Sequence, residues 1–219
     1  AIELIQKAKQ PIMIAGNGCI RKRASQQLRR FAELTEIGVV NTFMAKGCVD
    51  HEKKYCLFTI GLGAKDRIMR VLDESDLIIT LGFDMVEYPP ELWNSEGKHK
   101  IIHADFLPAE IDSHYHPDVE LVGDLAYSLS ELTNRLESLP PLTFCRHLQE
   151  VCRKEMIGDF EEHKDDDSLE KIRPQKVLWE VRQSMGPSDI LLSDVGAHKM
   201  WIARHYQCHE PNTCLISNG

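Results

Sequence analysis

The sequence lacks several features by which classes of protein are recognised. No apolar run approaches the roughly 20 residues that a membrane-spanning helix needs. The 219 residues carry 26 Lys and Arg against 34 Asp and Glu, a net charge of −8, whereas nucleic acids and anionic membrane surfaces attract positive charge. Neither a P-loop nor a Gly-x-Ser-x-Gly nucleophile elbow is present. We therefore expect no nucleic-acid partner, no membrane partner and no hydrolase chemistry.

Cysteine and histidine are present, but not in metal-binding or disulfide patterns. The seven cysteines form no Cys-x-x-Cys pair, and none combines with histidine at zinc-finger spacing. An odd number in a chain of this length, without a signal peptide, favours reduced, buried thiols in a cytoplasmic protein. His103 is interpreted as a core residue, and His114 and His116 as surface loop residues. The sequence thus predicts no metal site.

What the sequence does contain is a series of short apolar segments that alternate with helical ones. Strands are predicted over 11–15, 38–41, 76–81, 100–104 and 119–122. Helices are predicted at the start of the chain, over 22–36 and over 125–136, the last capped by Asp124. Such a pattern indicates a parallel sheet covered on both faces, with ligands at the carboxyl edge of the strands. We therefore predict an α/β protein with a Rossmann-like central domain over 1–138.

Two further segments follow the central domain. Pro140-Pro141 ends it, and residues 139–173 are predicted as a linker with an irregular helix and an acidic stretch. The triplet Asp165-Asp166-Asp167 is interpreted as solvated linker rather than as a metal site. A helix from Pro174, a strand over 189–193 and a helix from Gly196 indicate the start of another α/β domain, 174–219. Because the chain lacks an initiator Met and ends on a strand, we expect it to be a piece of a longer protein.

A glycine-rich run ends the first predicted strand. Gly16-Asn17-Gly18 stands where a nucleotide-binding loop would stand, and Gly82, followed by Asp84, closes the third strand. The full dinucleotide fingerprint fails, because Arg21 occupies the position of the third glycine and no acidic residue ends the second strand. The residues leave two alternatives open, a nucleotide-fold loop or a simple turn.

Asp194-Val195-Gly196-Ala197-His198 is the second candidate site. The run joins a predicted strand to a helix, and Gly196 allows the backbone to approach a ligand. Amides at a helix N-terminus favour an anion, and His198 adds a side-chain donor. The residues alone leave a phosphate site and an ordinary strand–helix turn equally open.

Taken in order, these pieces resemble the acetolactate synthase family of thiamine diphosphate enzymes. The run from Asp194 to Arg204, with Ser217-Asn218-Gly219, resembles the start of the diphosphate-binding domain of thiamine diphosphate enzymes. Segments 11–18, 58–63, 73–82 and 108–111 resemble the central domain of acetolactate synthases. Residues 83–94 are most similar to the catabolic, FAD-independent branch. The resemblance covers nearly the whole chain.

The resemblance implies a cytoplasmic carboligase that condenses two molecules of pyruvate, or of a related 2-oxo acid, with loss of CO2. It implies thiamine diphosphate and Mg2+ as cofactors and a homodimer or homotetramer as the assembly. The family's catalytic glutamate and its Gly-Asp-Gly metal motif do not occur in these residues, so no catalytic or metal-binding residue is expected and the chain alone should be inactive. The family positions that face the diphosphate are Val195, Gly196, Ala197 and His198, and those of the substrate channel are Gly61, Leu62 and Gly63.

The resemblance argues against FAD. Asp84 stands where the FAD-binding anabolic branch usually carries arginine, and a carboxylate there would repel the flavin's diphosphate. Leu107 also replaces a carboxylate that is usual in that branch. The alternatives are an anabolic acetohydroxyacid synthase, a sulfoacetaldehyde acetyltransferase, a glyoxylate carboligase or a pyruvate oxidase. From another class, the first domain could be a non-catalytic FAD- or NAD-binding module.

Overall fold

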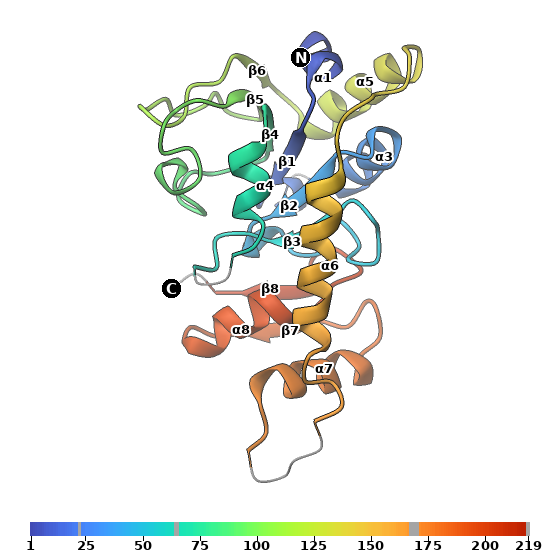
Figure 1. Cartoon of the computed structure of the whole chain (residues 1–219), viewed down its shortest axis with the longest axis vertical. Helices are drawn as coiled ribbons and strands as arrows, with labels where there is room; N and C mark the ends of the chain where they lie inside the picture. Colours follow the sequence, from blue (N-terminus) through green and yellow to red (C-terminus); the bar gives the residue numbers. More distant parts are fainter. Residues whose placement is uncertain (22, 64–65, 167–170, 218–219) are drawn as a thin grey trace.

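In the residues that the computed structural model describes (1–21, 23–63, 66–166 and 171–217), six parallel strands form a central sheet (Figure 1). Their order across the sheet is β3-β2-β1-β4-β5-β6, so the chain reverses its direction of travel between β1 and β4. The predicted α/β class and the parallel sheet are confirmed. The strands are β1 (Pro11–Ala15), β2 (Gly38–Asn41), β3 (Cys56–Thr59), β4 (Leu77–Leu81), β5 (Lys100–Asp105) and β6 (Val119–Val122).

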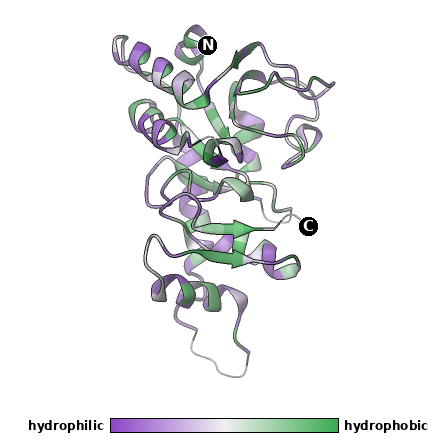
Figure 2. Cartoon of the chain, turned by 180° about the vertical axis from the view of Figure 1, so that it is seen from behind, coloured by the Kyte–Doolittle hydropathy of each residue, from purple (hydrophilic) through white to green (hydrophobic). Residues whose placement is uncertain are grey.

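Two apolar layers cover the central sheet. Along β1, Met13 belongs to a cluster with α1 (Ile2–Lys7), α3 (Ser25–Thr35) and α5 (Leu125–Glu137). Ile12 and Ile14 belong to a cluster on the other face with α4 (Met69–Glu74) and the loops that carry Tyr88 and Tyr115. Successive residues of a strand point to opposite faces, so every residue of β1 is buried. Figure 2 shows the hydrophobic colour concentrated on the strands.

Two predictions about local structure need correction. The helix predicted over 22–36 is α3, which begins only at Ser25, because a short helix, α2 (Gly18–Arg21), and a turn with Arg23 at φ +54° come first. Lys22 lies outside the described residues. The strand β3 was not predicted. It is short and irregular, with Phe58 at φ +63° and a register shift against β2, so it lacks a regular apolar pattern.

The helix α6 (His147–Glu161) joins the central sheet to the rest of the chain (Figure 1). Its buried Gln149 accepts a hydrogen bond from the Gly38 amide (3.2 Å) and donates one to the Pro11 carbonyl (2.9 Å). Farther along, Asp159 accepts two hydrogen bonds from the Arg67 guanidinium (2.7 and 2.9 Å). The acidic stretch that was expected in a linker therefore begins inside α6. Asp167 of the acidic triplet lies outside the described residues.

A second, smaller unit follows α6. The helices α7 (Pro174–Ser184) and α8 (Ala197–His205) pack against each other, and the strands β7 (Leu191–Ser193) and β8 (Cys214–Ile216) pair in parallel. Leu62 of the central unit is buried in the same cluster as Ile202 and Tyr206, so the two units share a core. None of the helices among the described residues has both the length and the apolar character needed to cross a bilayer.

Candidate functional site

The turn between β7 and α8 carries the residues predicted to face a diphosphate. Asp194 accepts a hydrogen bond from the Val195 amide through Oδ1 (2.7 Å), and Gly196 follows at φ +150°. This φ is strained for any residue with a Cβ, so the turn favours glycine, and a Cβ here would also lie 2.8 Å from Cε1 of His198. Residues 194–198 are all exposed. In the first turn of α8 the Lys199 amide donates to the Gly196 carbonyl (3.0 Å). The N-terminal end of a helix carries backbone N–H donors and a partial positive charge, which favour an anion.

The other predicted group, Gly61, Leu62 and Gly63, forms a loop at the end of β3. Asp66, which sequence reasoning missed, accepts hydrogen bonds from the amides of Gly61 (2.8 Å) and Leu62 (3.2 Å). Burial raises the pKa of the Asp66 carboxyl, and these two bonds partly oppose the shift. Because Asp66 binds the amides four and five residues earlier, a glycine pair followed closely by aspartate was the available signal.

The structure brings the loop 61–63 against the second half of α8, whereas residues 195–198 lie at the N-terminal end of that helix. Leu62 itself is buried, and its carbonyl accepts a hydrogen bond from Arg204 (3.5 Å). A cavity of about 300 Å³ lies beside this contact and is lined by Leu62, Trp201, Arg204 and His205, among others. The substrate-channel role of the loop therefore stays a prediction.

His205 lies in the wall of this cavity without a full set of polar partners. Its ring stacks on Trp201 (centroids 5.5 Å apart) and meets the edge of Phe160 (5.8 Å). Its Nδ1 is buried and has no hydrogen-bond partner among the described residues. Burial, together with the positive charge of Arg204, lowers the pKa of His205 to about 4. The imidazole is therefore neutral at neutral pH.

At the strand reversal between β1 and β4, the predicted nucleotide-fold residues do meet. The Gly16 amide donates to the Leu81 carbonyl (2.9 Å), and the Gly18 amide donates to the Gly82 carbonyl (2.8 Å). A Cβ on Gly18 would lie 2.5 Å from the Gly82 Cα, so two backbones touch here. Asp84 lies in the following turn, where its Oδ1 accepts from the Val86 amide (2.9 Å).

A carboxyl side chain already accepts a hydrogen bond from one backbone amide of this loop. Glu87, missed by sequence reasoning, accepts a hydrogen bond from the Asn17 amide (2.9 Å) and another from the Thr42 hydroxyl. Burial raises the pKa of Glu87, and the two hydrogen bonds partly oppose the shift. In a nucleotide-binding loop, the amide of Asn17 would be available to a phosphate oxygen. Here the Glu87 side chain takes that amide instead.

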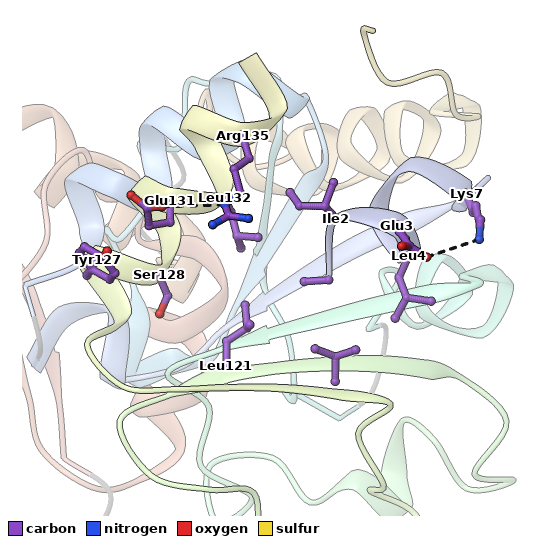
Figure 3. Close-up of a pocket in the computed structure, with 12 residues that line it drawn as sticks. Ile2, Glu3, Leu4, Lys7, Leu121, Tyr127, Ser128, Glu131, Leu132 and Arg135 are labelled. Atoms are coloured by element: carbon purple, nitrogen blue, oxygen red, sulfur yellow. Dashed lines mark ion pairs between the residues drawn. The ribbon is translucent and has the colours of Figure 1, made fainter. Parts of the chain in front are cut away.

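A cavity of about 610 Å³ contains none of the predicted site residues (Figure 3). It lies between α1, β6 and α5, with Ile2, Leu4 and Leu132 among its apolar lining. Its charged side chains include Glu3 and Lys7, which form an exposed ion pair at 3.8 Å. Glu131 and Arg135 also line the cavity and form a second ion pair at 3.8 Å, so its charged side chains pair with one another.

Comparison with known proteins identifies the family. Residues 1–132 match the family model of the thiamine pyrophosphate enzyme, central domain. The whole chain is 29% identical over 222 residues to "Acetolactate synthase" of Bacillus subtilis (strain 168), of which it covers 38%. It is 30% identical over 237 residues to "Probable acetolactate synthase large subunit" of Methanococcus aeolicus, covering 39% of that protein. It is 32% identical over 227 residues to "Acetolactate synthase" of Mycobacterium bovis, covering 36%.

The chain thus spans about two-fifths or less of the length of these relatives. The relatives align with both units of the structure, whereas the family model ends within α5. The family resemblance of the sequence is therefore confirmed. The chain belongs to the thiamine pyrophosphate enzymes, and residues 1–132 match their central domain.

Proposed function

We propose that this chain is part of an acetolactate synthase, which condenses two molecules of pyruvate into 2-acetolactate with release of CO2. Relatives of that name align with the entire chain, which supports the proposal. Residues 1–138 supply the central domain, 139–173 a connecting segment, and 174–219 the start of the cofactor-binding domain. The whole enzyme is a cytoplasmic homodimer or homotetramer that uses thiamine diphosphate and Mg2+.

The observation that carries the proposal is the turn before α8. Val195, Gly196, Ala197 and His198 hold the diphosphate, because exposed helix N-terminal amides suit an anion. Gly196, at φ +150°, lets the ligand approach the main chain, and the His198 ring lies against that glycine. Thiamine diphosphate, when bound, supplies the electron sink for decarboxylation of the 2-oxo acid. The residues of this chain bind and orient the cofactor.

The remaining machinery lies outside these 219 residues. The two Gly-Asp pairs, Gly123-Asp124 and Gly158-Asp159, are followed by Leu125 and Phe160 rather than by glycine. Asp124 instead caps α5 through the Tyr127 amide (2.7 Å). The chain by itself therefore supplies no Mg2+ motif for the diphosphate and is inactive with pyruvate.

FAD has no place in this proposal. Glu87 takes the loop amide that a flavin diphosphate would need, and the exposed carboxylate of Asp84 follows in the next turn. The exposed carboxylate of Asp84 opposes a diphosphate through like-charge repulsion. The purified full-length enzyme is expected to show no flavin absorbance, and flavin absorbance would favour an anabolic synthase or a pyruvate oxidase.

The test compares two glycine-to-alanine variants of the full-length enzyme. In Gly196→Ala, the free turn is expected to relax away from φ +150°, and binding must restore that conformation at a cost of about 1–3 kcal/mol. This cost corresponds to roughly 5- to 150-fold weaker binding of thiamine diphosphate. Gly158→Ala is the matched control, because a Cβ on Gly158 of α6 meets nothing within 4 Å. Unchanged binding in Gly196→Ala would refute the role of the turn. Consumption of pyruvate without formation of acetolactate would refute the reaction.

A further inference from the structure

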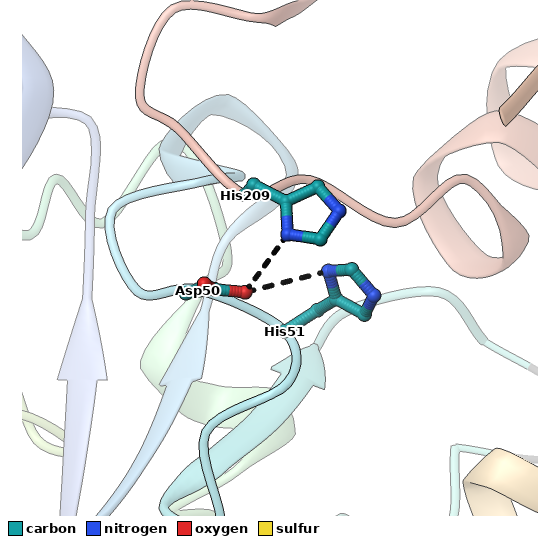
Figure 4. Close-up of side chains that lie close together, drawn as sticks. All are labelled: Asp50, His51 and His209. Carbon is teal, nitrogen blue, oxygen red and sulfur yellow. Dashed lines mark ion pairs between the residues drawn. The ribbon is translucent and has the colours of Figure 1, made fainter. Parts of the chain in front are cut away.

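Where the two units meet, two neighbouring side chains that could ligate a metal lie beside a third from far along the chain. Asp50 and His51 lie in the loop between β2 and β3, and His209 lies in the segment between α8 and β8. In Figure 4, both imidazole rings turn a nitrogen toward the Asp50 carboxylate. This cluster plays no part in the proposed reaction, and the sequence, read in order, gave no sign of it.

We propose that Asp50, His51 and His209 form a binding site for a divalent transition-metal ion of the Zn2+, Co2+ or Ni2+ class. Two imidazole nitrogens and one carboxylate oxygen form a ligand set that suits such ions better than it suits Mg2+ or Ca2+. The site is independent of the proposed enzyme function. It would fasten the second unit to the central one.

The distances fit a tetrahedral ion. Ligands about 2.1 Å from a tetrahedral ion lie about 3.4 Å from one another. Oδ1 of Asp50 is 3.3 Å from Nδ1 of His209 and 3.6 Å from Nδ1 of His51. All three ligand atoms lie within 4.8 Å of one another, so a small inward movement of one ring closes the set. A water molecule would complete the coordination.

The backbone around the site is fixed without help from the rings. The Arg29 guanidinium donates to the carbonyls of Gly47 (2.9 Å), Cys48 (3.1 Å) and His209 (2.6 Å), and so binds both segments. Arg153 donates to the His51 carbonyl (2.8 Å). Ligands held in place in this way lose little conformational entropy when an ion arrives.

The electrostatics favour the ligand forms of the side chains. Burial and the neighbouring His209 lower the pKa of His51. Nδ1 of His51 also lies 3.2 Å from the Cys208 carbonyl, and ion binding would shift the ring proton to Nε2. Arg29 adds a positive charge nearby, but its Nη1 is paired with Glu210 (3.3 Å). The three side chains are 22–27% exposed, which leaves an ion a way in from solvent.

The test is a titration of the metal-free 219-residue chain with Co2+ by visible absorption and with Zn2+ by calorimetry. We expect one ion per chain, the absorption bands of tetrahedral Co2+ without a thiolate charge-transfer band, and a rise in melting temperature. His209→Gln and Asp50→Asn should each weaken binding at least about tenfold. His116→Gln, at an exposed histidine outside the cluster, is the control and should bind like the wild type.

Three results would overturn the proposal. They are failure to bind Co2+, Zn2+ or Ni2+ at millimolar concentration, unchanged affinity in both cluster variants, and a thiolate band, which would assign the ion to cysteine. Circular dichroism checks that the variants fold. Because Asp50→Asn preserves the size of the side chain, it decides the question if His209→Gln is unfolded.

Discussion

Acidification should destabilise the junction between α6 and α8 through His205. An unfolded histidine titrates near pH 6.5, whereas burial lowers the pKa of His205 to about 4. Between these values the unfolded state binds the proton more readily than the folded state does. The contribution of neutral His205 to the free energy of unfolding is therefore fully present above pH 6.5 and is lost as the pH falls toward 4.

The magnitude follows from the two pKa values. At pH 5 an unfolded His205 is almost fully protonated and a folded one is mostly neutral, which costs about 2 kcal/mol of the free energy of unfolding. Replacement by phenylalanine keeps a ring against Trp201 and Phe160 and removes both the proton site and the unpaired Nδ1. His205→Phe should therefore lose about 2 kcal/mol less stability than the wild type between pH 7 and pH 5.

Urea denaturation of both proteins at pH 7 and pH 5 measures this difference. The wild type also carries His51 and His99, whose pKa values are lowered by burial, so its total loss exceeds the share of His205. The comparison with His205→Phe cancels those contributions. His116→Phe, at an exposed position, should follow the wild-type pH profile. Parallel profiles for the wild type and His205→Phe would refute the reasoning.

Three further predictions concern single contacts. Glu87→Ala should lower the free energy of unfolding, measured in urea, by about 1–3 kcal/mol, since it leaves the Asn17 amide without an acceptor. Glu87→Gln keeps an acceptor oxygen and should cost less. Equal losses in the two variants would contradict the role of that oxygen. Asp124→Ala should cost about 1 kcal/mol through loss of the cap on the Tyr127 amide, and Asp124→Ser should restore most of it. With Ellman's reagent, one thiol, that of Cys145, should react quickly in the native chain, because the other six cysteines are buried; a second fast thiol would disprove this burial.

Local patterns were enough for much of the fold. β1, β2 and β6 begin and end at the predicted residues, because each is a short apolar run bounded by turn residues. The turn over 194–198 was also found, since all its residues are adjacent in the chain. β3 was missed because its backbone is irregular.

The polar groups that complete the sites could not be read from the sequence. Glu87 meets Asn17 across 70 residues, and His209 reaches Asp50 only because the second unit packs on the first. Such contacts depend on the order of the strands and on the packing of α8. No local spacing encodes them, whereas Asp66, which binds amides a few residues away, did leave a local signal.

The two hydrogen bonds of Gln149 have a practical consequence for dissecting the chain. A shortened chain ending at residue 138 would strip the amide of Gly38 and the carbonyl of Pro11 of their partner and uncover the surface beneath Phe160. The smallest autonomous folding unit therefore extends at least through Glu161. That folding unit ends well after residue 132, the last residue that matches the family model.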